Sequence, residues 1–488
     1  MKKSTSKIVS RLLSPDHRDI GWDYLVFAIC AGFLGSVLSF LIRAGLHVST
    51  VDALKPVAQI LFNQQSDASV KLLLLLSKSH ALIMTFLMVM PALIGGFANW
   101  LVPLMIGAGN VAFPKVNRLA FWLLIPALIM LILGFVGASN NLHPHLLLLV
   151  AIYLASFSLL LTFGNLFTTI IALRILPMRL LDMPVFVWSV LISSFLGVVY
   201  VPIMLAAITF DFGASQKPHE DMQIALWFFS HPEIYVLLLP AFGIISQIVS
   251  TFSKRVLVGQ KIVIGSMILL GLFGFMLWVE NLFAPAMEFS VARYFSYALP
   301  LIGLPSIVII VCWLLTIYQA RPAMSVPMHW VMGFIVMSLI GGLSALQLNN
   351  SRLSVPQDAS AIISHFHYIL SLSAVFAIFA GWYFWFPKMS GYVYNLSAAK
   401  LHFWSLFTGV NMIFLPQFFV EIFPPVIPLL GAILSGFSLL IFLSVLAWSY
   451  ISKRSAGMNP WGEGAVTLEW RSPSTQVASS AGQPEVSR

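Results

Sequence analysis

The sequence consists mainly of long apolar runs separated by short polar stretches. A helix that crosses a bilayer needs about 20 predominantly apolar residues. Twelve such runs occur, at residues 22–46, 70–106, 119–137, 146–173, 183–209, 222–250, 262–284, 295–318, 328–347, 359–386, 402–422 and 425–452. The runs lack the alternation of a barrel strand, so each predicts a helix that satisfies its own backbone groups. The pattern predicts an all-α integral membrane protein, a twelve-transmembrane-helix bundle.

The segments outside the runs define the expected domain organisation. Residues 1–21 are basic and lack the apolar core of a signal peptide, so they predict a retained N-terminal tail. Residues 22–452 form one helical membrane domain, and the polar residues 453–488 predict a disordered tail. The second run is long for one crossing, and residues 95–110 are expected to hold a bend or an interfacial turn.

Composition narrows the class further. The chain is 59% hydrophobic and 9% charged, whereas soluble domains carry roughly 25% charged residues. This balance excludes a disordered chain, a disulfide scaffold and a nucleic-acid binder, although the net charge is +9. Lys and Arg concentrate in the loops on the side of the N-terminus, which predicts that both termini are cytoplasmic. Without a transit peptide, the expected location is a bacterial inner membrane.

Four of the eleven histidines lie deep in the predicted spans: His80, His231, His365 and His367. Ionisable groups inside a membrane are costly and therefore indicate function. Imidazoles without carboxylate partners suit haem iron, for which histidine is a common axial ligand. The other seven lie near span ends and are interpreted as interfacial residues: His17, His47, His143, His145, His219, His329 and His402.

The spacing of His365 and His367 carries geometric information. Residues two apart on an α-helix point about 200° apart. These two imidazoles therefore cannot share one metal, but each can ligate a different cofactor on opposite faces of the helix. His80 could then complete bis-histidine ligation of one cofactor.

The segment His231-Pro232-Glu233-Ile234-Tyr235 is a second unusual feature. His231 and Tyr235 lie one turn apart on the same helix face. Glu233 places a carboxyl group at membrane depth, where a neutral carboxyl could relay protons. The alternative is a proline kink beside a glutamate that hydrogen-bonds between helices.

Three stretches resemble the haem-copper oxidase superfamily, most of all subunit I of cytochrome c oxidase. They are SHALIMTFLMVMPALIGGFANWLVPLMIGAGNVAFPKVN, WFFSHPEIYVLLLPAFGIIS and SHFHYILSLSAVFAIFAGWYFWFPKMSG. The resemblance runs from about residue 17 to the last span. It implies a twelve-helix bundle that holds a low-spin haem beside a high-spin haem facing a second metal.

The resemblance also implies roles for individual residues. His80 and His367 match the axial ligands of the low-spin haem, and Arg43 matches an arginine near it. His365 matches the ligand of the high-spin haem. The remaining matches are to a ligand of the second metal (His231), a tyrosine cross-linked to that ligand (Tyr235) and the glutamate that ends a proton channel (Glu233).

The sequence departs from the family at the second metal. Where the family has two adjacent histidines after a tryptophan, this chain has Trp278-Val279-Glu280-Asn281. His231, Glu280 and Asn281 would make an oxygen-rich site, which suits non-haem Fe(II) better than copper.

Other departures affect the proton channels and haem contacts. Asn110 and Ile309 stand where the family has the aspartate and the lysine of its two proton channels. Gln357 replaces a histidine that helps to bind magnesium, and LPQFFVEIFPPVIP lacks an arginine pair that holds haem propionates.

These departures resemble the nitric oxide reductases of the same superfamily, which use non-haem iron with a glutamate and lack the pumping channels. The expected function is reduction of NO to N2O at a haem/non-haem-iron site without proton pumping. Glu280, Tyr235 and Glu233 are the expected catalytic residues, and copper is the alternative metal.

Two other functions stay open. Tyr235 and Glu233 favour a divergent cytochrome c oxidase that reduces O2 to water. Loss of the metal ligands would also fit a non-catalytic di-haem electron-transfer subunit without a second metal. The expected partners are membrane lipid, a small gaseous substrate (NO or O2), and an electron-delivering subunit II-like protein or cytochrome c; no nucleic acid is expected.

Overall fold

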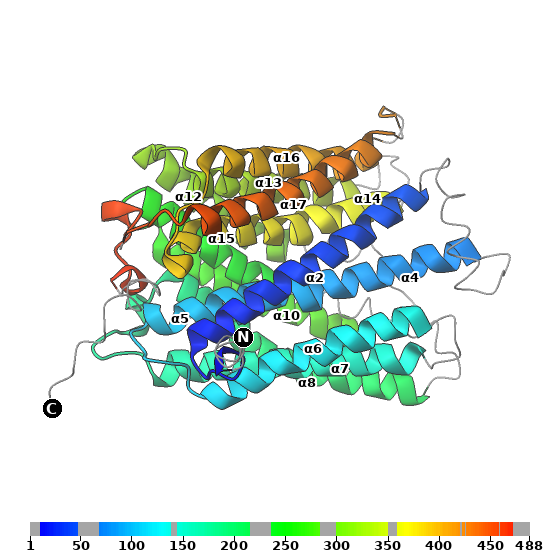
Figure 1. Cartoon of the computed structure of the whole chain (residues 1–488), viewed down its shortest axis with the longest axis horizontal. Helices are drawn as coiled ribbons and strands as arrows, with labels where there is room; N and C mark the ends of the chain where they lie inside the picture. Colours follow the sequence, from blue (N-terminus) through cyan, green and yellow to red (C-terminus); the bar gives the residue numbers. More distant parts are fainter. Residues whose placement is uncertain are drawn as a thin grey trace.

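The chain folds into a bundle of long helices. The computed structural model describes residues 10–46, 68–137, 144–214, 236–283, 299–349, 359–419, 422–424, 426–457 and 459–471. No strand occurs within these ranges. The helices run roughly along the long axis of the molecule, with α2 crossing the others obliquely (Figure 1). The end at which α2 begins, on the left of Figure 1, also holds the end of α17 and is called the proximal end below.

The first half of the chain supplies most of one side of the bundle, where α6, α7 and α8 lie next to one another (Figure 1). The helices of this half are α2 (His17–Leu46), α4 (Ala68–Leu82), η1 (Ile83–Val89), η2 (Pro91–Ala98), α5 (Asn99–Met105), α6 (Pro114–Gly137), α7 (Pro144–Ala172), η3 (Leu180–Asp182), α8 (Val185–Ala214) and an apolar helix at Val236–Phe252.

The second half forms the other side, where α16 packs along α17. Its helices are α10 (Gln260–Phe283), η4 (Leu299–Gly303), α12 (Leu304–Ala320), α13 (Val326–Asn349), α14 (Ala359–Phe366), η5 (His367–Leu372), α15 (Ser373–Ser390), α16 (Leu396–Phe414), η6 (Leu415–Phe418), α17 (Val426–Ser452), η7 (Gly462–Gly464) and η8 (Leu468–Trp470).

Ten helices in the described ranges are long and apolar enough to cross a membrane. This confirms the prediction of an all-α membrane bundle, but not the count of twelve. The predicted span at 222–250 is represented by the shorter apolar helix Val236–Phe252. The predicted span at 402–422 lies mostly in α16, which is not among the ten.

The second span stays helical from Leu72 to Met105. Two π-helical segments, η1 and η2, widen it at mid-length. The expected turn lies at its end, where Gly107 has a φ of +72°. A left-handed conformation of this kind is available to glycine at little cost. π segments of this type are often found at functional sites.

Residues 459–471, called the C-terminal strap below, pack against the proximal end of the bundle. The Trp461 indole donates a hydrogen bond to the Phe384 carbonyl at 2.9 Å and stacks on the Phe384 ring. Trp470 is 3% exposed and packs edge-on against the same ring. A side chain at Gly464 would collide with the Thr251 carbonyl, because a Cβ there would lie 2.0 Å from that oxygen. The expectation of a disordered tail is therefore wrong for these residues.

The strap connects two helices through a buried carboxyl group, that of Glu469. The Thr467 hydroxyl donates to Glu469 at 2.8 Å and accepts from Gln247 of the helix Val236–Phe252 at 3.0 Å. Lys388 of α15, which is 1% exposed, attracts the carboxylate electrostatically. Burial nevertheless dominates and raises the pKa of Glu469 to about 7.

Docking of the strap should therefore depend on pH. An undocked carboxyl has a pKa of 4.5, so the docked form binds more protons between pH 4.5 and 7. Docking should be strongest at low pH, weaken by up to about 3 kcal/mol across this window, and change little above it. Amide hydrogen exchange of residues 459–471, corrected for intrinsic rates, measures the opening free energy.

Two variants separate this effect from general loosening. Glu469→Gln should make strap opening independent of pH. Glu463→Gln should behave like the parent, because Glu463 forms an exposed ion pair with Lys254 at 3.5 Å. An opening free energy that stays flat from pH 4.5 to 7 in the parent would contradict the role of Glu469.

Candidate functional site

Three elements bring together the residues expected at the low-spin haem, and two of these residues contact Phe414 of a fourth element. His80 comes from α4, His367 begins η5, Arg43 lies in the last turn of α2, and Phe414 ends α16. The His367 ring stacks on Phe414 with 4.2 Å between centroids. The Arg43 guanidinium lies 5.2 Å from the centre of the same ring. His80 and Arg43 are both close enough to His367 to interact with it electrostatically.

Hydrogen bonds fix the tautomers of these two histidines. His80 Nδ1 lies 2.8 Å from the Gly35 carbonyl, and His367 Nδ1 lies 2.7 Å from the Ile363 carbonyl. A carbonyl oxygen can only accept, so Nδ1 carries the proton in both neutral rings. Nε2 then holds the lone pair that can bind a metal. Metal-bound histidines in other proteins commonly donate their second ring N–H to a carbonyl in the same way.

His365 contacts a different helix, α13. Its Nδ1 lies 2.9 Å from the hydroxyl of Ser344, which belongs to α13. His367, only two residues later, faces α16 through Phe414. The two imidazoles therefore contact different helices, and their ligation of two different cofactors stays a prediction. The change from α14 to the π segment η5 falls between them.

Only some of the residues expected at the second metal lie in the described part of the chain. His231, Glu233 and Tyr235 lie outside the described residues. Glu280 and Asn281 belong to the last turn of α10, which the structure describes by its backbone alone. Their roles as metal ligands and catalytic residues stay predictions. The helix Val236–Phe252, which follows Tyr235, is held in place by Trp313, whose indole donates to Ser246 at 2.9 Å.

Asn110 and Ile309, which stand where the family has its channel residues, make structural contacts. The Asn110 amide donates to the Pro15 carbonyl at 3.2 Å and so holds the N-terminal segment. Ile309 is fully buried in the apolar core. Gln357 lies outside the described residues.

A buried ion pair lies near Asn110 and was not expected from the sequence. Arg118 donates to the Asp23 carboxylate at 2.5 Å, and both side chains are almost inaccessible. Arg118 also donates to the carbonyls of Ser14 and Arg11. These bonds fasten the N-terminal segment over the proximal end. The signal in the sequence was Asp23 itself, an ionisable residue within the first predicted span.

Two histidines interpreted as interfacial are buried instead. His17 is 2% exposed and contacts the Asn99 carbonyl at 3.0 Å, and His402 is fully buried and hydrogen-bonds the Tyr383 hydroxyl at 2.9 Å. That interpretation is wrong for both. A position near the end of a span did not predict whether these side chains are exposed, because tertiary packing covers these helix ends.

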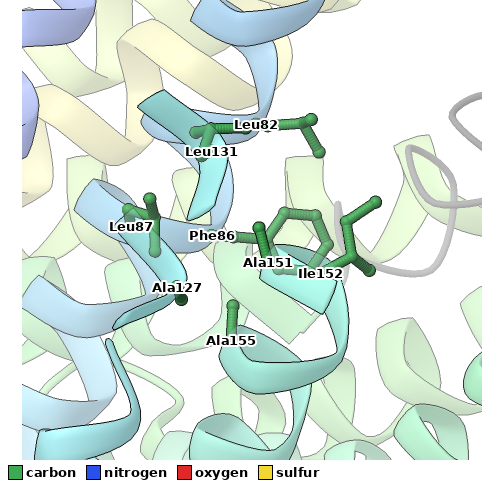
Figure 2. A pocket seen from close by; sticks show the side chains of 8 residues that line it. All are labelled: Leu82, Phe86, Leu87, Ala127, Leu131, Ala151, Ile152 and Ala155. Carbon is green, nitrogen blue, oxygen red and sulfur yellow. The ribbon is translucent and has the colours of Figure 1, made fainter. Parts of the chain in front are cut away.

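An apolar pocket lies between η1, α6 and α7, a short way along the second span from His80 (Figure 2). Phe86, Leu131 and Ile152 are among its lining residues, and it exposes no polar surface. It contains no polar or titratable group that could bind a metal or a polar substrate. It is therefore not a candidate for the catalytic centre.

Together these features define a membrane helix bundle in which His367 and Arg43 meet at the ring of Phe414, with His80 close to them. A family model described as "Cytochrome C and Quinol oxidase polypeptide I" matches residues 19–423. The chain is also 33% identical to "Cytochrome c oxidase subunit 1" of Candida albicans (strain SC5314 / ATCC MYA-2876), over 85% of this chain and 81% of that protein. The chain therefore belongs to the haem-copper oxidase subunit I family, whose members are membrane oxidoreductases that bind haems and a second metal.

The haem ligands can be tested one haem at a time. His365→Ala should remove the high-spin haem and leave the low-spin haem, because its contacts lie on α13. His80→Ala should disturb only the low-spin haem. Pyridine haemochrome assays count the haems, and optical spectra of the reduced protein distinguish the two types. Loss of the same haem in both variants would contradict the assignment to opposite faces.

Proposed function

We propose that this chain is the catalytic subunit of a membrane enzyme that reduces two NO molecules to N2O and water. The reaction consumes two electrons and two protons, and it proceeds without proton pumping. The observation that carries the proposal is the replacement of two adjacent histidines by Glu280 and Asn281 at the end of α10. A ligand set with one imidazole and two oxygen donors favours non-haem iron over copper.

The described residues support the binding of two haems. His80 and His367, with Arg43 beside them, would hold the low-spin haem, and His365 would hold the high-spin haem. When bound, the two haems would carry the electrons, and the high-spin haem would bind the gaseous substrate. His231, Glu280 and Asn281 would hold the second metal.

The protons would reach the site without a pumping channel. Glu280 and Glu233 are the proposed donors, because carboxyl groups at membrane depth can hold a proton near neutral pH. Asn110 and Ile309 cannot exchange protons as an aspartate and a lysine do.

Reduction of O2 to water is the second candidate. The named relative is a cytochrome c oxidase subunit 1, and 33% identity over most of both chains favours this function. Tyr235 supports it as well, since cleavage of O2 needs an electron and a proton close to the metal. The second metal would then be copper or iron with an unusual ligand set.

The proposed electron donor and membrane location follow from membership of this family. Electrons would come from a subunit II-like protein or from cytochrome c, because the haems lie within the bundle. The Lys and Arg distribution supports an orientation with both termini in the cytoplasm, and the proposed location is a bacterial inner membrane.

The variant Glu280→Gln tests the proposal directly. It should lose the second metal and at least about 100-fold of the NO turnover, because one anionic ligand is removed. Both haem spectra should stay unchanged, since Glu280 is not a haem ligand. N2O production from NO with an artificial electron donor gives the rate, and metal analysis gives the occupancy.

Glu463→Gln is the matched control, since it removes a glutamate on the exposed surface of the strap. It should keep the metal and the full rate. Full metal content in Glu280→Gln would remove Glu280 from the site. A parent protein that consumes O2 and leaves NO unchanged would establish the second candidate instead.

A further inference from the structure

Ser344 is a residue of α13 whose side chain contacts His365 of α14. Its side chain is buried at 4% exposure. The hydroxyl donates to the Gly341 carbonyl of its own helix at 2.8 Å. The same oxygen lies 2.9 Å from His365 Nδ1.

The direction of this short chain of hydrogen bonds can be worked out. A serine hydroxyl has one hydrogen, and here it points to the Gly341 carbonyl. Toward His365 the hydroxyl can therefore only accept, so Nδ1 must be the donor. The chain runs from His365 Nδ1–H to Ser344 Oγ and on to the Gly341 carbonyl. It leaves Nε2 as the nitrogen with a lone pair for a metal.

This arrangement differs from that of the other two histidines. His80 and His367 donate to the backbone carbonyls of Gly35 and Ile363, which no substitution can remove. At His365 a side chain accepts the bond. A hydroxyl that itself donates onward is polarised and becomes a better acceptor.

We propose that Ser344 is a positioning residue for the haem ligand His365. It holds the imidazole in the Nδ1–H tautomer, orients Nε2 and strengthens electron donation from the ring to the iron. The inference rests on the proposed role of His365 as the ligand of the high-spin haem. Partners of this kind commonly tune metal-bound histidines.

The surroundings make the position of Ser344 well defined. A Cβ on Gly341 would lie only 3.1 Å from the Ile369 backbone nitrogen, so α13 approaches η5 at van der Waals distance. The Gly341 carbonyl also lies within hydrogen-bonding reach of His365. If the hydroxyl is removed, this carbonyl can replace it in part. The expected consequence is a weaker bond and a shifted ligand, with the haem retained.

The test uses the full-length, haem-loaded protein with three variants. Ser344→Ala removes the hydroxyl, Ser344→Thr keeps it, and Ser338→Ala removes a serine of the same helix that instead contacts Ser373 at 3.3 Å. Resonance Raman spectroscopy of the reduced protein records the iron–histidine stretching band of the high-spin haem. Redox titration records its midpoint potential.

Ser344→Ala should shift the band to lower frequency and raise the midpoint potential, because the imidazole becomes a weaker donor. Ser344→Thr and Ser338→Ala should leave both unchanged, and the bands of the low-spin haem should stay constant in all three. If Ser344→Ala fails to assemble the high-spin haem, assembly in Ser344→Thr supports the role of the hydroxyl.

Two results would overturn the inference alone. One is an unchanged band and potential in Ser344→Ala. The other is equal loss of the high-spin haem in the Ala and Thr variants, which would show a packing role only. Absence of the iron–histidine band in the parent protein would be different, because it would remove the haem role of His365 itself.

Discussion

The structure depends on one constraint, that a polar group inside an apolar helix bundle must find a partner within the protein. In His80 and His367 the Nδ1–H group donates a hydrogen bond to a backbone carbonyl, and in His365 it donates to a serine hydroxyl. Satisfying the constraint therefore also selects the tautomer. In each ring Nε2 then carries the lone pair, which is the tautomer that the proposed haem ligation requires.

The same constraint shapes the proximal end. Arg118 and Asp23 neutralise each other there, and Arg118 uses its other donors to fasten residues 11–14 across the helices. At the same end the C-terminal strap buries Glu469 near Lys388. Both termini of the described chain thus close the same end.

Much of this could be predicted from the sequence. Apolar run lengths gave the helices, because the bilayer fixes how long a span must be. The two-residue spacing of His365 and His367 predicted that they serve different faces, because helical periodicity alone determines it. The strap and Ser344 could not be predicted in this way. A serine within an apolar helix carries no signal, and the burial of Glu469 depends on contacts with helices more than 80 residues away in the sequence. For Glu280 and Asn281 the sequence still carries the prediction, since it rests on the chemistry of the replaced ligands.

The most direct test is the number of iron and copper atoms per purified protein, measured by mass spectrometry and compared with the haem count. The proposed function predicts three irons, two haems and no copper, because Glu280 and Asn281 provide oxygen ligands suited to iron. One copper with two irons would contradict it and indicate an oxidase with an unusual ligand set. Two irons, two haems and no copper would contradict it as well, and would indicate a di-haem subunit without a second metal.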